Sequence, residues 1–143
     1  MRPIKILLVE DNPGDALLAK VAFEKSRSAI EIQVAADGVE AIDFLYKKGS
    51  FAGAETPDLI LLDLNLPGKS GIEILEDIKK DELLKVIPVI VLTTSQAKWD
   101  ILKCYSLHAN CFVNKPLGFD SFDKIVASIE DFWCATVRLP FPN

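Results

Sequence analysis

The sequence has few of the residues that build disulfide frameworks, zinc sites or histidine clusters. It contains three cysteines, Cys104, Cys111 and Cys134, and a single histidine, His108, among 143 residues. The number of cysteines is odd and no two have C-x-x-C spacing, so we expect reduced thiols rather than disulfides or a zinc site. Reduced thiols are typical of the cytosol, and we expect a cytoplasmic protein.

An excess of positive charge and a long apolar segment are also missing. Lysine and arginine number 16 against 21 acids, a formal net charge of −5. Phosphate backbones and anionic membrane surfaces repel a protein of this sign, so we expect neither a nucleic-acid nor a membrane partner. No apolar run approaches the roughly 20 residues that span a bilayer, and the N-terminus does not resemble a signal peptide.

What the sequence does contain is a regular alternation of short apolar runs and amphipathic segments, at a length that suits one domain. The expected strands are 4–9, 30–34, 59–62, 89–92 and 111–113, and a helix is expected after each. Such units predict an α/β domain, a doubly wound five-stranded parallel sheet with helices on both faces. Strand 30–34 alternates apolar and polar residues, which indicates a place nearer a sheet edge.

Four of these strands end in polar side chains: Glu10 and Asp11, Asp63, Thr93, and Lys115. Parallel strands bring their carboxyl ends to one edge of a sheet, where ligands bind. Crowded carboxylates repel one another, and Mg²⁺ would relieve that repulsion. Asp63 follows the most uniformly apolar strand, and we expect it to be exposed enough to attack phosphorus. Lys115 would pair with that carboxylate and then with a phosphoryl oxygen, to which Thr93 would also donate.

Each of these residues alone has a simpler interpretation. Glu10 and Asp11 could be a solvated strand end, Asp63 a helix cap, and Lys115 an ordinary surface lysine. Thr93 is a common strand-terminal residue. Their convergence at one edge is what favours phosphoryl transfer.

In order, type and spacing these positions resemble the response-regulator receiver family of two-component systems, whose fold is flavodoxin-like. The resemblance extends to about residue 131. It implies that Asp63 is the phosphoacceptor and that Mg²⁺ is bound by Asp11, Asp63 and the backbone carbonyl of Asn65. Glu10 would reach the metal through water.

The same resemblance implies that Thr93 and Phe112 form a switch pair and that Lys115–Pro116 is a cis peptide. The implied function is a phosphorylation-dependent switch rather than an enzyme. It would accept a phosphoryl group from a sensor histidine kinase and signal through protein contacts or onward phosphotransfer, without a DNA-binding output domain.

Segments 10–15, 63–68 and 130–133 are also similar to the stand-alone response regulators of cyanobacterial phytochromes, so the implied kinase is a phytochrome. His108 departs from the family, because many receivers have glycine after the fourth helix. A helix end there needs a left-handed residue, which costs a non-glycine residue about 1 kcal/mol.

Two other functions compete with the switch. A Mg²⁺-dependent phosphohydrolase usually needs a second acid two residues after its nucleophile, and this chain has Asn65 there. A flavin-binding module would need hydroxyl and amide donors in the first loop, where this chain has acids.

We divide the chain into a receiver domain, 1–131, and an apolar C-terminal extension, 132–143. The extension would leave an apolar cluster in water, and such patches often mark contact sites, so we predict a homodimer. Folding of the tail onto its own domain and disorder of the tail are the alternatives. The predicted dimer contacts are Phe132, Trp133, Val137, Leu139 and Phe141.

Overall fold

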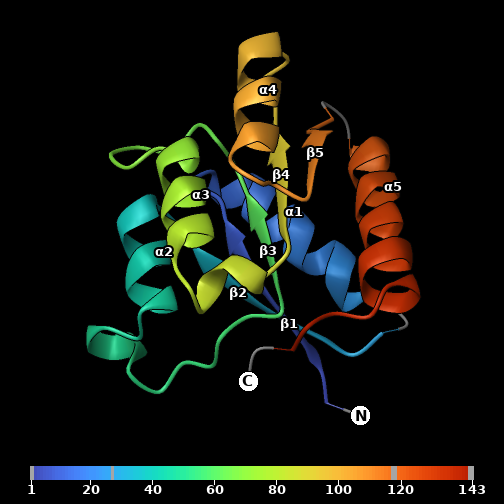
Figure 1. Ribbon diagram of the computed structural model, residues 1–143. Helices are drawn as coiled ribbons and strands as arrows, with labels where there is room; N and C mark the ends of the chain where they lie inside the picture. Colours follow the sequence, from blue (N-terminus) through green and yellow to red (C-terminus); the bar gives the residue numbers. More distant parts are fainter. Residues whose placement is uncertain (1, 27, 117–118, 142–143) are drawn as a thin grey trace.

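The computed structural model describes residues 2–26, 28–116 and 119–141, without the side chains of residues 119–121. Its strands form a single sheet in the order β2-β1-β3-β4-β5 (Figure 1), and every pairing is parallel. The strands are β1 (Ile4–Val9), β2 (Ile30–Ala35), β3 (Leu59–Leu62), β4 (Val89–Thr93) and β5 (Cys111–Asn114). The predicted parallel sheet is confirmed, and β2 lies at an edge as its alternating side chains indicated.

Helices cover both faces of this sheet because its central strands β3 and β4 are apolar and buried on both sides. Helices α1 (Pro13–Glu24) and α5 (Phe119–Ile129) pack on one face. The other face is covered by α2 (Gly38–Leu45), α3 (Gly71–Lys80) and α4 (Lys98–Ser106). Successive residues of β1 alternate between the two cores: Leu7 belongs to one and Leu8 to the other. The doubly wound architecture is therefore confirmed.

Side-chain caps set the starts of the helices that border the candidate site. The Asn12 side chain accepts a hydrogen bond from the Asp15 backbone N–H at 3.0 Å, and Pro13 stands in the first turn of α1. Ser70 begins α3 with a capping box to Glu73, a feature that the sequence analysis did not identify. These caps hold the two loops that follow β1 and β3.

The expectation for the end of α4 is confirmed. His108 follows the helix with a φ of 72°, in the left-handed region, and its side chain is exposed. The chain turns there toward β5 in spite of the cost to a non-glycine residue.

Beyond α5 the chain continues as a π-helical segment, η3 (Glu130–Thr136), which the sequence analysis did not predict. The tail then turns back across the amino-terminal end of the sheet (Figure 1). There the Arg2 guanidinium lies 4.5 Å from the centre of the Phe141 ring.

The expectation that Leu139 contributes to an exposed patch is wrong. Leu139 is buried, because folding of the tail onto its own domain removes this side chain from water. Phe132 and Phe141 remain exposed, whereas Trp133 and Val137 are half-buried. Among the described helices, none combines the length and apolar character needed to cross a membrane.

Candidate functional site

Three carboxylates meet at the carboxyl edge of the sheet. Glu10 and Asp11 follow β1 and Asp63 follows β3, and these strands are neighbours with Val9 opposite Leu62. One carboxylate oxygen from each acid lies within 4.8 Å of the other two. Oxygen donors at this spacing suit a hard divalent cation such as Mg²⁺ or Mn²⁺. The predicted convergence of these acids is confirmed.

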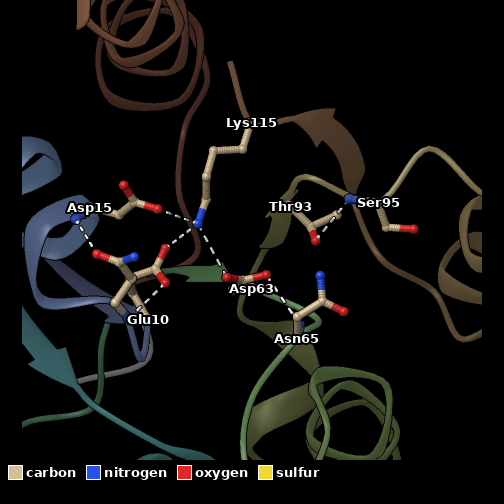
Figure 2. Close-up of polar contacts among 8 residues, drawn as sticks. Glu10, Asp15, Asp63, Asn65, Thr93, Ser95 and Lys115 are labelled. Atoms are coloured by element: carbon tan, nitrogen blue, oxygen red, sulfur yellow. Dashed lines mark hydrogen bonds and ion pairs between the residues drawn. The ribbon is translucent and has the colours of Figure 1, made fainter. Parts of the chain in front are cut away.

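Lys115 reaches the acids from the end of β5 (Figure 2). Its ammonium nitrogen lies 3.1 Å from an oxygen of Asp63, is ion-paired with Glu10 and lies 3.1 Å from an oxygen of Asp15. The described chain contains no cis peptide bond, so the expectation of a cis Lys115–Pro116 bond is wrong. The long lysine side chain reaches the acids from a trans bond, the form that X–Pro peptides favour intrinsically.

Burial and pairing shift the pKa values of Glu10 and Lys115. Desolvation raises the pKa of Glu10 to about 7, although the hydrogen bond and charge of Lys115 act against it. Burial lowers the pKa of Lys115, but the hydrogen bond to Glu10 and the charges of Asp63 and Glu10 outweigh it and raise that pKa above its usual value. The lysine is therefore charged, while Glu10 titrates near neutral pH.

Asp63 is buried, which corrects the expectation of an exposed nucleophile. One carboxylate oxygen pairs with Lys115, and the other accepts a hydrogen bond from the Asn65 N–H at 3.2 Å. The loop after β3 folds back over the strand end, where the Gly71 N–H donates to the Leu64 carbonyl at 3.1 Å. The side chain is thus held by contacts on both of its oxygens.

Gly71 is required by this close approach. A Cβ at this position would lie 2.3 Å from the Asp63 carbonyl oxygen and 2.5 Å from the Leu64 Cα. Both are backbone atoms that cannot turn aside, so only glycine lets α3 start directly against the aspartate. The role of Gly71 was not predicted from the sequence, since the approach is a tertiary contact.

Thr93 and Phe112 lie on the same face of the sheet. Thr93 ends β4 fully buried, and its hydroxyl accepts a hydrogen bond from the Ser95 N–H at 3.4 Å. Phe112 is half-buried in β5 opposite Val91, which precedes Thr93 by two residues. Residues two apart on a strand share a face, so the phenyl ring and the threonine belong to the side covered by α3 and α4.

Asp15 is an acid of the site that was not predicted from the sequence. It stands in the first turn of α1, four residues after Asp11, and contacts Lys115 through its carboxylate. The spacing from Asp11 was the available signal, because a first-turn side chain can face the strand end from which the helix starts.

Comparisons with known proteins agree with this geometry. Residues 6–127 match the family model described as the response regulator receiver domain. The chain is 44% identical to the response regulator Rcp1 of Synechocystis sp. over 138 residues, covering 96% of this chain and 94% of that protein.

Two solved structures are also similar. The phosphorylated cyanobacterial phytochrome response regulator RcpA is 46% identical with a TM-score of 0.94, covering 97% of this chain and 99% of that one. The Mn²⁺-bound form of Rcp1 is 43% identical with a TM-score of 0.93, covering 96% of this chain and 99% of that one.

Proposed function

This chain belongs to the response-regulator receiver family, and we propose that it is a signalling switch that accepts a phosphoryl group on Asp63 from a sensor histidine kinase. One observation carries the proposal: Asp63 lies in a cluster of three carboxylates, with the ammonium of a buried lysine 3.1 Å from its own oxygen. In transfer, a carboxylate oxygen of Asp63 forms the bond to phosphorus as the bond between phosphorus and the kinase histidine nitrogen breaks.

The residues of the cluster fit a divalent cation, and we propose Mg²⁺. Asp11 and Asp63 offer direct oxygen ligands, and the backbone carbonyl of Asn65 would add a third; Glu10, close to both acids, would reach the cation through a water. When bound, the cation neutralises charge that otherwise opposes the approach of a phosphoryl group. Lys115 would exchange its contact with Asp63 for one with a phosphoryl oxygen. The Mn²⁺-bound form of Rcp1 supports a divalent cation in this family.

The proposed product is an aspartyl phosphate that persists as a signal. The position two residues after Asp63, where aspartate-based phosphohydrolases usually carry a second acid, holds Asn65. An amide cannot take a proton from water at neutral pH, so we propose a regulator that assists its own phosphorylation rather than a phosphohydrolase. The signal would pass through protein contacts or onward phosphotransfer in the cytoplasm.

The proposed kinase is a phytochrome, on the strength of the similarity to RcpA, which is described as a cyanobacterial phytochrome response regulator. Incubation with a phytochrome kinase and labelled ATP in each light state should label the wild type in a light-dependent way. Asp63→Asn should stay unlabelled. Asp100→Asn, which removes a carboxylate beyond β4, is the matched control and should be labelled like the wild type. Labelling independent of light, or equal labelling of Asp63→Asn, would contradict the proposal.

We propose that Thr93 and Phe112 convert phosphorylation into a change of surface. A phosphoryl group on Asp63 would draw the Thr93 hydroxyl from its contact with the Ser95 N–H, and the space released would admit the Phe112 ring. Thr93→Ala should therefore accept phosphate at Asp63 yet lose any phosphorylation-dependent change in partner binding or assembly. A variant that switches normally would refute this coupling.

We also propose a homodimer whose contact is limited to the exposed side chains of the C-terminal extension, 132–143. Phe132 is exposed on η3 and packs edge-on against Trp133 at a centroid distance of 5.4 Å. β5, the strand beside it, lies at the edge of the sheet. Light scattering should give about twice the monomer mass. Phe132→Asp should reduce it to the monomer mass without loss of phosphorylation. A wild-type monomer at high concentration, with and without phosphodonor, would exclude the dimer.

A further inference from the structure

The three N–H groups of the Lys115 ammonium meet three carboxylates from three different elements. Its nitrogen contacts Glu10 after β1, Asp63 after β3 and Asp15 in the first turn of α1. The lysine side chain is 6% exposed, whereas that of Asp15 is 33% exposed. Each donor therefore has its own carboxylate acceptor, and only the Asp15 acceptor is open to solvent.

Asp15 is fixed in place but lies outside the proposed cation site. Its backbone N–H donates to the Asn12 side chain at 3.0 Å, which ties the residue to the start of α1. The carboxylates that lie within 4.8 Å of one another are those of Glu10, Asp11 and Asp63. The Asp15 carboxylate thus contacts the lysine but does not belong to the group of carboxylates that would bind the cation.

We propose that Asp15 is a positioning residue for phosphoryl transfer, one that holds the Lys115 ammonium so that its remaining N–H is aimed at Asp63. In Figure 2 Asp15 and Asp63 lie on opposite sides of the lysine nitrogen, with Glu10 between them. The proposal rests on the proposed function, since the N–H aimed at Asp63 is the one that would pass to a phosphoryl oxygen. With Glu10 and Asp15 retaining two N–H groups, the third has a fixed direction before and after transfer.

An ordinary surface ion pair would have a different effect. It would add little to stability and nothing to the rate of transfer, because exposed pairs are weak and Asp15 touches no reacting atom. The positioning role instead predicts a lower rate of transfer with unchanged cation affinity. It also predicts that the effect of Asp15 disappears when there is no lysine to position.

The test is phosphorylation of the full chain by phosphoramidate under single-turnover conditions over a range of Mg²⁺ concentrations. Asp15→Ala should lower the limiting rate about tenfold. Asp15→Asn, which keeps an acceptor oxygen but no charge, should fall between Asp15→Ala and the wild type. The Mg²⁺ concentration at half-maximal rate should change less than about twofold. Glu24→Gln, which removes a charge from the other end of α1, is the matched control and should have the limiting rate of the wild type. When Asp15→Ala is added to Lys115→Met, the limiting rate should fall no further.

Three results would overturn the proposal. The first is that the limiting rates of both Asp15 variants equal that of the wild type. The second is an unchanged limiting rate with a higher Mg²⁺ concentration at half-maximal rate, and the third is that Asp15→Ala lowers the rate of Lys115→Met as much as it lowers that of the wild type. Asp15→Asn is nearly isosteric and keeps the test available if Asp15→Ala does not fold. If the wild type itself takes up no phosphoryl group on Asp63, the proposed function fails and this inference fails with it. Failure of the inference alone is recognised by normal phosphorylation in the wild type and in both variants.

Discussion

Two buried aspartates stand at opposite ends of β3, Asp58 directly before the strand and Asp63 directly after it. At the amino end, one oxygen of Asp58 pairs with the Arg2 guanidinium at 2.6 Å, and the other accepts a hydrogen bond from the Lys5 N–H at 2.9 Å. One negative charge thus meets one positive charge, and each oxygen has a short contact.

At the carboxyl end the charges do not balance. Asp63 shares the single ammonium of Lys115 with Glu10 and Asp15, and Asp11 lies beside them without adding a cation. Four acids therefore share this end with one lysine, and three of them contact it. Burial of an aspartate is therefore not itself a sign of function: the charge of Asp58 is matched by its partner, whereas the carboxyl end keeps negative charge that a divalent cation would neutralise.

The largest expected effect is on stability at the balanced end. Asp58→Ala leaves Arg2 and the Lys5 N–H without their acceptor, and we expect the free energy of unfolding to fall by about 3 kcal/mol. Asp63→Ala removes one of several mutually repelling acids and should cost much less. Urea unfolding of both variants in the absence of Mg²⁺ measures the difference. Equal losses would show that the two ends are energetically alike.

The next largest difference between the two ends of β3 should be in how Mg²⁺ changes the free energy of unfolding. At a Mg²⁺ concentration about 100 times the Kd, binding should raise the free energy of unfolding of the wild type by about 2.7 kcal/mol. Asp11→Asn should lose most of this gain, because one carboxylate of the cluster becomes a neutral amide. Asp58→Asn, the control at the other end, should retain the full increment on its lower baseline. A Mg²⁺ increment in Asp11→Asn equal to that of the wild type would contradict the site.

The pH dependence of the metal-free protein gives a more specific signal. Desolvation raises the pKa of Glu10 from 4.5 to about 7 in the folded state, so between these values the folded protein holds a proton that the unfolded chain has released. The contribution of Glu10 to stability is thus full below about pH 4.5 and is lost as the pH rises through 7. Unfolding measured in EDTA should show this decline, and Glu10→Gln should flatten it. An identical slope in the variant would refute the raised pKa.

The smallest effect is expected where the tail meets the balanced end. Phe141→Ala removes the ring beneath the Arg2 guanidinium and should cost about 0.5–1 kcal/mol. Phe141→Tyr retains the aromatic face and should lose less. Chemical denaturation of both variants is the measurement. A loss from Phe141→Ala as large as that from Asp58→Ala would mean that the tail, rather than the ion pair, stabilises this end.

The same two ends show what the sequence could predict. The strands and the acids that follow them were predictable because apolar periodicity marks a strand and parallel strands end at one edge. Asp63 was identified by position, but its burial was not, since that depends on how closely Gly71 lets α3 approach. The roles of Asp15 and Asp58 depend on Lys115 and Arg2, which are 100 and 56 residues away in the sequence. No local pattern marks such distant pairs, and the burial of Leu139 escaped the sequence analysis for the same reason.

The central claim is that Asp63, at the unbalanced end, is the residue that accepts the phosphoryl group. Its most direct test is mass spectrometry of the intact chain and of its peptides after treatment with phosphoramidate and Mg²⁺. We predict one phosphoryl group per chain, located on Asp63 and absent from both Asp63→Asn and EDTA-treated wild type. Asp58→Asn should still carry it. An equal adduct on Asp63→Asn, or a phosphoryl group on another residue of the wild type, would contradict the account.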